Sequence, residues 1–223
     1  MENIINDYLS RKIEMDDEFE LGCNGCGKCC HIETLILTGY DVYRIAKHLG
    51  KTTIQLINEN CFVYIGDDSN LPIVSIKPRT ADSSCRFLRK GKCTINEVKP
   101  NSCALYPLGR MYDAQTEEYI YFKQSIRCGN KETSTLREWL DSINIEEIDR
   151  MSIPWGNALM DLALYLQTLK NLHKEQLVGI RNIIFITLYL NYDTNKDYVE
   201  QLERNMGMLE ESFPRFKRKH KDY

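Results

Sequence analysis

The sequence predicts an α+β fold, mostly α, in which a cysteine-rich, irregular metal-binding half packs on a helical C-terminal half. Two observations predict this division. All nine cysteines lie in the first 128 residues, among short apolar runs separated by Asp, Ser, Asn, Pro and Gly. After about residue 133 the cysteines stop and apolar residues recur at helical spacing. The 223 residues suit a single domain, 1–223, with a metal-binding region at 21–130, a helical region at 133–213 and a basic tail at 214–223.

Two helices are predicted between the first cysteine cluster and the strands. Thr38 with Asp41 has the pattern of a capping box, which predicts the start of a helix, and Gly50 predicts its end. A second box, Thr52 with Gln55, predicts a short helix immediately afterwards. The apolar face of this second helix is expected to comprise Ile54, Ile57 and Cys61.

Short strands are predicted from three apolar runs, Phe62–Ile65, Ile73–Ile76 and Tyr119–Phe122. The second half then opens with another capping box, Thr135 with Glu138, ahead of an apolar stripe. The change from short runs to a regular stripe predicts a change from small sheets to packed helices.

The helical half is expected to contain several further helices. Asn144 is predicted to cap a short helix that ends before Pro154, because proline interrupts the helical hydrogen-bond pattern. Helices are predicted over residues 155–173 and 175–190, although Ile, Phe and Thr in the latter also suit a strand. A final helix is marked by Tyr198, Leu202, Met206 and Leu209. These regular stripes predict a core that the helical half forms by itself.

The composition is that of a globular protein, with 43% hydrophobic and 27% charged residues and a formal net charge of −3. The first residues lack a basic segment followed by an apolar core, so no signal peptide is expected. The longest apolar stretch, Ile183–Leu190, is far shorter than the roughly 20 residues that span a bilayer. We therefore expect a cytoplasmic protein with neither a membrane nor a nucleic acid among its partners.

The cysteines carry the chemical signal of the sequence. Their odd number and the expected compartment argue against a disulfide framework and favour metal binding or redox work. Cys23, Cys26 and Cys29 repeat the Cys-x2-Cys spacing twice, which matches three corners of a cubane iron–sulfur cluster whose fourth ligand is distant. Cys30 follows directly and is expected to point to the opposite side. Structural zinc sites usually contain two separated Cys-x2-Cys pairs. In this sequence only the first cysteine cluster has that spacing, and the later cysteines do not.

The later cysteines, Cys85, Cys93, Cys103 and Cys128, are widely spaced and must be gathered by tertiary folding. Gly91 is expected to turn the chain between the first two of them. Cys61 is interpreted as a buried thiol on an apolar helix face, and His31 as a neighbour of the metal rather than a ligand. The cluster loop of radical S-adenosylmethionine enzymes, Cys-x3-Cys-x2-Cys, is absent from the sequence, as is the phosphate loop G-x4-G-K-[ST].

The ordered motifs CNGCGKCC, CRFL, GKC, VKPNSC and ALYPLGR resemble the CxxCxxCC cysteine-cluster family, also called YkgJ-like proteins or zinc- or iron-chelating domains. The family also contains the flagellin lysine N-methylases. The resemblance covers about residues 21–128 and departs at Lys99–Pro100, where the family commonly has Arg-Pro. It implies a cysteine-ligated metal centre, more often iron–sulfur than zinc. The residues carried over are Cys23, Cys26, Cys29, Cys30, Cys85, Cys93 and Cys103, with Cys128 as a weaker match.

Three functions are compatible with these patterns. The leading one is a cytoplasmic metalloprotein that holds an iron–sulfur cluster, with [4Fe–4S] favoured over other forms and zinc as the alternative. The resemblance implies a second, a protein-lysine N-methyltransferase that uses S-adenosylmethionine on a protein substrate, although no motif for either substrate is found in the sequence. The third is a zinc-stabilised interaction module whose basic tail contacts an acidic partner. The tail is otherwise expected to be a solvated, frayed terminus.

Overall fold

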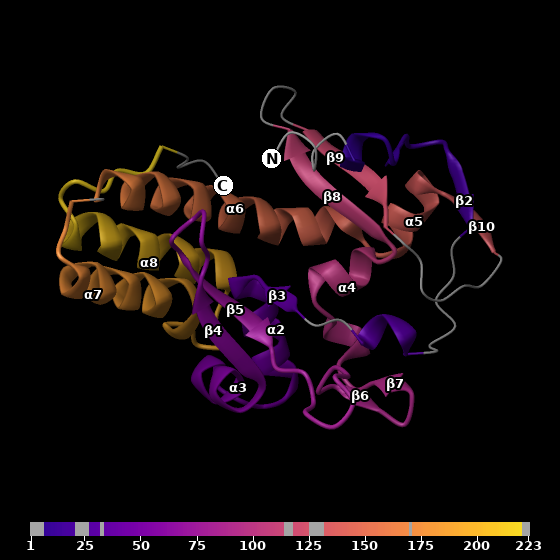
Figure 1. Cartoon of the computed structure of the whole chain (residues 1–223), viewed down its shortest axis with the longest axis horizontal. Coiled ribbons are helices and arrows are strands. Elements are labelled where there is room, and N and C mark those ends of the chain that lie inside the picture. The colour runs from indigo at the N-terminus through magenta and orange to yellow at the C-terminus, as the bar shows by residue number, and fades with distance from the viewer. Residues whose placement is uncertain are drawn as a thin grey trace.

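The computed structural model describes residues 7–20, 27–31, 34–113, 118–124, 132–169 and 171–219. Helices outweigh strands in these ranges, and the strands form small antiparallel sheets, which confirms the predicted α+β, mostly α class. The long helix α6 (Ile145–Thr168) runs across the molecule and joins a larger lobe, on the left of Figure 1, to a smaller lobe on the right. None of the described helices combines the length and the apolar character that crossing a bilayer requires.

The larger lobe contains a three-stranded sheet and the two predicted early helices. Its strands β3 (Leu35–Leu37), β5 (Pro72–Ile76) and β4 (Cys61–Ile65) lie side by side in that order and pair antiparallel. The helices are α2 (Gly39–His48) and α3 (Thr53–Asn60), and each starts with a complete capping box. Both predicted boxes and two of the predicted strands are therefore confirmed.

The predicted apolar face of the second helix is wrong at two positions. Ile54 is exposed, because the buried side of α3 is formed by Leu56 and Ile57. Cys61 is buried as expected, but it is the first residue of strand β4 and not part of a helix. The capping box sets where α3 begins, and the hydroxyl of Thr53 donates a hydrogen bond to the Leu190 carbonyl, which fixes the side that faces inward.

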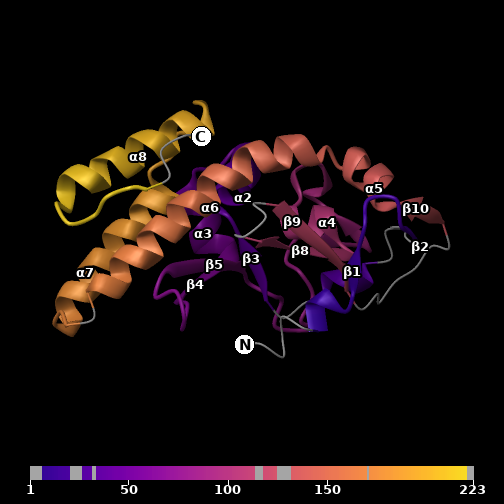
Figure 2. The same cartoon turned by 90° about the horizontal axis from the view of Figure 1, so that it is seen from above.

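The C-terminal half contains three main helices, which contribute to one hydrophobic core. Helix α6 is followed by α7 (Lys174–Phe185), which continues as a π-helical turn, η3 (Ile186–Leu190), and then by α8 (Tyr198–Ser212). The helices predicted over 175–190 and around Tyr198 are confirmed. The helix predicted over 155–173 is confirmed for residues 155–168, which form the second part of α6. Seen from above in Figure 2, α8 lies on one side of α6 and α7, and the β3–β5–β4 sheet lies on the other.

Helix α6 runs through Pro154. The sequence had predicted a short helix that ends before this proline, and that prediction is wrong. Proline has no N–H to donate to the Arg150 carbonyl, and a proline inside a helix costs about 3 kcal/mol. The helix continues because one unbroken apolar stripe is buried on both sides of the proline, and this burial offsets the cost. The stripe consists of Ile148, Met151, Trp155, Ala158 and Leu162. Asn144 precedes the helix in a left-handed conformation and makes no capping hydrogen bond.

The two halves share one hydrophobic core, so the expected separate core of the helical half is wrong. Val42, Ile45 and Ala46 of α2 belong to the same buried cluster as residues of α6, η3 and α8. Gly39, at the start of α2, shows how close the contact is. A Cβ atom there would lie 2.5 Å from the Trp155 ring and 2.7 Å from the Leu188 carbonyl.

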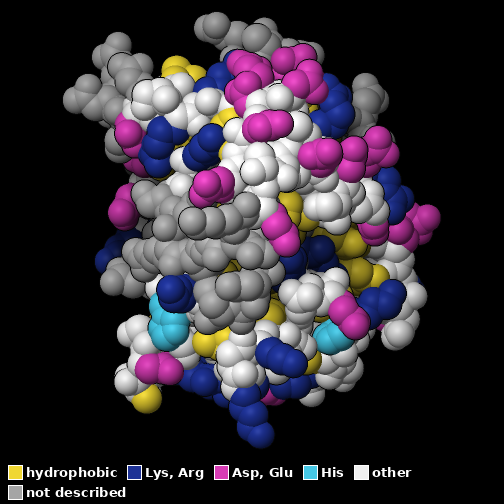
Figure 3. Space-filling model, turned by 90° about the vertical axis from the view of Figure 1, so that its right-hand side faces the viewer, with side chains coloured by type: hydrophobic (Ala, Val, Ile, Leu, Met, Phe, Trp, Pro, Cys, Tyr) yellow, Lys and Arg dark blue, Asp and Glu magenta, His cyan; other side chains and the backbone are white. Residues whose placement is uncertain are grey.

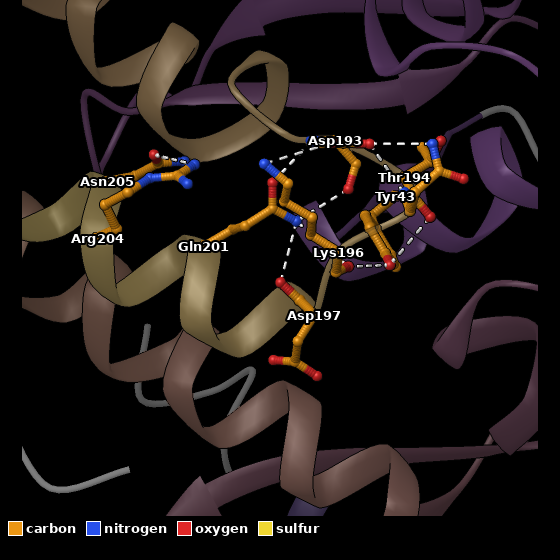
Figure 4. Close-up of polar contacts among 9 residues, drawn as sticks. Tyr43, Asp193, Thr194, Lys196, Asp197, Gln201, Arg204 and Asn205 are labelled. Atoms are coloured by element: carbon orange, nitrogen blue, oxygen red, sulfur yellow. Dashed lines mark hydrogen bonds and ion pairs between the residues drawn. The ribbon is translucent and has the colours of Figure 1, made fainter.

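Polar contacts also join α2 to the loop that precedes α8 (Figure 4). The Tyr43 hydroxyl donates a 2.6 Å hydrogen bond to the Lys196 carbonyl. Gln201, one turn into α8, donates to the Asp193 and Asp197 carbonyls at 3.0 Å, and its Oε1 accepts from the Asp193 amide at 2.8 Å. The loop is thus held on both sides, which fixes α8 against α2.

The smaller lobe has its own cluster of buried residues. Strands β1 (Lys12–Ile13), β9 (Glu118–Lys123) and β8 (Leu108–Asp113) form one sheet, and β2 (Glu18–Glu20) pairs with β10 (Thr133–Thr135). Helix α5, Leu136–Ser142, follows with the predicted capping box in place. The strand predicted at the third apolar run is confirmed as part of β9. The cluster between these elements comprises Ile13, Phe19, Leu105, Leu108, Tyr121, Leu136 and Leu140.

The described part of the basic tail is docked, which corrects the expectation of a frayed terminus up to residue 219. Phe216 is buried in the main core. The Arg218 guanidinium pairs with Glu203 at 2.8 Å and with Glu210 at 3.2 Å, and the Lys219 amide donates to the Asp161 carboxylate at 3.0 Å.

Charges of both signs are spread over the face shown in Figure 3, with acidic side chains more frequent in its upper part and basic ones in its lower part.

Candidate metal centre

Five of the eight candidate ligands line one cavity of about 720 Å³, which opens between the sheet of the larger lobe and the segment that precedes β8. They come from four separate segments of the chain: Cys29, Cys30, Cys85, Cys93 and Cys103. The six described cysteines form no disulfide with one another. Tertiary folding therefore gathers the later cysteines beside the first cluster, as predicted for Cys85, Cys93 and Cys103.

A tight turn places the first pair. Residues Lys28–Cys30 form a 3-10 turn, η1, and Gly27 ahead of it has a left-handed φ of 70°. The Cys30 amide donates to the Gly27 carbonyl at 3.0 Å, which closes the turn. Because the backbone turns here instead of being extended, Cys29 and Cys30 line the same cavity, and the expected opposite orientation of Cys30 is wrong. The Cys30 carbonyl then accepts a 2.7 Å hydrogen bond from the Cys85 amide. This backbone bond joins the early cysteine cluster directly to the first of the late cysteines.

A two-residue hairpin places Cys93. Strands β6 (Leu88–Arg89) and β7 (Lys92–Cys93) pair with Leu88 opposite Cys93. The turn between them consists of Lys90 and Gly91, both with positive φ, of 48° and 75°. Two consecutive residues with positive φ are typical of the type I′ turn, which suits the twist of a hairpin. The predicted turn at Gly91 is confirmed, and it sets the register that brings Cys93 to the cavity.

Helix α4 (Asn101–Leu105) places Cys103, and a buried charged network holds this helix in position. The Arg44 guanidinium on α2 donates to the Lys99 carbonyl at 2.6 Å, to Asn101 Oδ1 at 2.7 Å and to Asp41 Oδ1 at 2.8 Å. Asp41 is 1% exposed, and its Oδ1 also accepts from the Asn101 amide at 3.1 Å. Because hydrogen bonds to charged groups are strong, α2 fixes the backbone two residues before Cys103.

No sequence pattern predicted this network, because Asp41 was interpreted only as part of the capping box. Asp41 does both tasks, since its Oδ2 accepts from the Thr38 amide while its Oδ1 serves Arg44 and Asn101. The available signal was the spacing of Asp41 and Arg44, three residues apart on one helix face. The residue on the other side of the contact, Ser152 of α6, receives a 2.9 Å hydrogen bond from the Asn101 side-chain amide.

Arg44→Ala is expected to destabilise the fold by about 2 kcal/mol and to lower the metal content of the purified protein. The change leaves the buried Asp41 carboxylate and the Lys99 carbonyl without their charged donor. Chemical denaturation and metal analysis of the same samples would measure both effects. Arg137→Ala is the matched control, because Arg137 pairs with Asp16 in an exposed ion pair and should change stability by less than about 0.5 kcal/mol. Equal effects of the two variants would contradict the role given to Arg44.

Burial and neighbouring thiols disfavour the thiolate form of the cysteines in this cavity. A hydrogen bond with Cys29, and then burial, raises the pKa of Cys30 far above its ordinary value. Burial, and then the charges of Cys85 and Cys29, raises the pKa of Cys103 to about 12. Burial also raises the pKa of Cys85, although the backbone amides of Phe87 and Leu88 favour its thiolate form. Thiolates in this cavity repel one another, and a metal ion among them reverses the sign of that interaction.

Part of the predicted ligand set lies outside the described residues: Cys23, Cys26 and Cys128. Among the residues that are described, no three Cys, His, Asp or Glu side chains stand close enough to share one metal ion. Which thiols bind directly therefore stays a prediction. Cys61 does not line the cavity, and burial raises its pKa to about 12.

The donor chemistry of the cavity fits a thiolate-preferring metal. Cysteine sulfur is a soft ligand that selects zinc, copper(I) or iron–sulfur clusters over magnesium or calcium. The remaining wall is largely apolar, with Leu35, Ile36 and Ile95 among its residues, which limits water at the centre. Two further polar side chains at the rim, Tyr106 and Gln124, were not singled out from the sequence.

Comparison with known families gives a direct result. Residues 22–129 match the CxxCxxCC family, which is described as a "Putative zinc- or iron-chelating domain". Nearly half of the chain, its cysteine-rich part, is therefore similar to this family. Comparisons with curated proteins and with solved structures give no match.

The matched segment contains all eight candidate ligands and the hydrogen-bond network that joins α2 to α4. Helices α6, α7 and α8 lie outside the segment, yet α6 and α8 complete the core on which α2 is packed. The family assignment supports zinc or iron chelation by this chain and leaves the kind of centre open to a proposal.

Proposed function

We propose that this protein is a cytoplasmic metalloprotein that holds an iron–sulfur cluster, with [4Fe–4S] favoured. The observation that carries the proposal is that five cysteines from four chain segments line one largely apolar cavity. Thiolate ligation and a hydrophobic surrounding are the usual environment of iron–sulfur clusters. The family's zinc- or iron-chelating description supports a metal in general, and the sequence pattern supports iron and sulfide in particular.

The pattern that favours iron–sulfur over zinc is the double Cys-x2-Cys spacing of Cys23, Cys26 and Cys29. Cys30 lies with Cys29 on the turn η1, and both line the cavity. In the proposed arrangement the triplet supplies three ligands to one cluster, and the distant cysteines supply the rest. The full proposed ligand set is Cys23, Cys26, Cys29, Cys30, Cys85, Cys93, Cys103 and Cys128.

Protein made and purified without oxygen is expected to contain iron and acid-labile sulfide in about equal amounts, because cubane clusters contain equal numbers of both. Elemental analysis, sulfide assay and the visible absorbance of the cluster would measure this. The control is the same preparation from cells supplied with excess zinc. Stoichiometric zinc without sulfide in both preparations would contradict the iron–sulfur assignment and favour the zinc-stabilised interaction module.

The size of the cavity favours one second candidate, a methyltransferase that uses S-adenosylmethionine on a protein lysine. At about 720 Å³ the cavity falls within the roughly 300–1,000 Å³ typical of small-molecule sites. A methyl donor would then lie beside the metal centre. Titration calorimetry of S-adenosylmethionine into the metal-loaded protein separates the two candidates, because a cluster-binding protein without this activity gives no saturable heat.

A further inference from the structure

Strand β4 exposes apolar side chains along its whole length after Cys61. Phe62 is 52% exposed, Val63 44%, Tyr64 40% and Ile65 39%. Edge strands of soluble proteins are normally protected from pairing with another chain by charges, prolines or bulges. Residues 62–65 contain no proline and no charged residue, and they pair regularly with β5 over the whole strand. This edge has the features of a surface that pairs with a further strand.

The outer side of β4 has no strand beside it in the described part of the chain. The sheet order is β3–β5–β4, so β4 is terminal. In Figure 2 the β4–β5 hairpin lies at the margin of the molecule, on the side away from α8. The outer side of β4 is therefore an edge of this sheet among the described residues.

The hydrogen-bond pattern shows which backbone groups face outward. The Lys77 amide donates to the Asn60 carbonyl at 2.8 Å, and the Gly66 amide donates to the Leu71 carbonyl at 2.9 Å. Bonded pairs alternate along an antiparallel ladder, so Phe62 and Tyr64 use their backbone groups toward β5. The N–H and C=O groups of Val63 and Ile65 consequently face away from the sheet.

We propose that β4 pairs antiparallel with β4 of a second copy of this chain, around a two-fold axis at Val63. In this register Val63 lies opposite Val63 of the second copy, and Ile65 lies opposite Cys61. Each Val63 exchanges both of its backbone hydrogen bonds, and each Ile65 amide donates to the Cys61 carbonyl of the second copy. The Cys61 amide makes no hydrogen bond to the second copy in this arrangement. It is already used within the chain, because it donates to the Ile57 carbonyl at the end of α3.

Charge complementarity along the strand favours a second copy over an unrelated extended peptide. Lys77 lies beside the start of β4, with its Nζ 5.7 Å from the centre of the Phe62 ring. Asp67 and Asp68 lie just beyond the end of β4 and are exposed. Glu59 also lies at this end of β4, but it pairs with Lys51, so the end keeps a net positive charge. Antiparallel pairing brings this end of each copy to Asp67 and Asp68 of the other. The symmetric arrangement is the one expected of an isologous dimer.

One strand pair is a small interface, so the dimer is expected to be concentration-dependent, with a Kd of about 1–100 μM. Sedimentation velocity of the full chain over this range should show a monomer–dimer equilibrium. Val63→Pro removes an outward N–H that the β4–β5 ladder does not use, and it should raise the dimer Kd at least about tenfold. Val63→Lys should do the same by placing two positive charges at the two-fold axis.

Val178→Lys on α7 is the matched control, because Val178 has the same side chain at 46% exposure, and it should leave the equilibrium unchanged. Circular dichroism checks that all three variants remain folded. A monomer at every concentration would overturn the proposal, as would a dimer that both Val63 variants retain. A dimer that only Val178→Lys weakens would place the interface on α7 and would also overturn it.

Discussion

Cys85→Ala is expected to lose the bound metal and much of the fold, whereas Cys61→Ala is expected to keep both. Cys85 lines the cavity and Cys61 does not, although Cys61 is the more deeply buried thiol. Loss of a structural metal removes roughly 10 kcal/mol of binding free energy that is also folding free energy. Replacing a buried thiol that binds nothing leaves only a small cavity, with a cost of about 1 kcal/mol. Metal analysis and far-ultraviolet circular dichroism of the two variants would measure the difference.

The metal-free protein should also lose its helices in one step, because α2 and the C-terminal helices share a core. Cys85 thus tests the arrangement of the core as well as the ligand set. A Cys85→Ala variant that keeps helices α6 to α8 while the first half unfolds would contradict the shared core. Equal metal loss in both cysteine variants would place Cys61 among the ligands.

Gly39→Ala and Gly207→Ala are expected to change stability in opposite directions. A methyl group on Gly39 would meet the Trp155 ring, the Leu188 carbonyl and the Tyr198 hydroxyl, all within 2.8 Å. Overpacking against groups this well buried should destabilise the fold by at least about 3 kcal/mol. Gly207 lies in the middle of α8 with open space around it, so alanine should stabilise the fold by about 0.5–1 kcal/mol. Urea denaturation of the two variants would measure both signs.

Gly39→Ala should in addition lower the metal content, because α2 carries the Arg44 side chain that holds the segment before Cys103. Gly207→Ala should leave the metal content unchanged. If Gly39→Ala were as stable and as metal-loaded as the parent protein, the close packing of α2 on α6 would be wrong.

Local sequence signals predicted the local structure of this protein well. The capping boxes that begin at Thr38, Thr52 and Thr135 all form, because a box satisfies helix-end amides with side chains only three residues away. The turn at Gly91 forms for a similarly local reason. Pro154 was misjudged because the local cost of a proline was visible in the sequence, whereas the burial that offsets it depends on distant elements.

The site was predictable in its residue types but not in its arrangement. The spacing of the first cysteines indicated a metal, and the wide spacing of the later ones indicated that folding must gather them. The contacts that do the gathering are between residues far apart in sequence, such as the Cys85 amide on the Cys30 carbonyl and Arg44 on Asn101. No periodicity or spacing encodes such pairs, so the shape of the cavity could be obtained only from the folded chain.

The packing of α2 on Trp155, Leu188 and Tyr198 has a consequence for the order of events during synthesis. A ribosome adds roughly 5–20 residues per second, so every candidate ligand up to Cys128 is made several seconds before the end of α8. During that interval the thiols exist without the helices that support their positions. The proposed centre therefore reaches its final form only once α8 has been made, and its cysteines must stay reduced until that helix has docked.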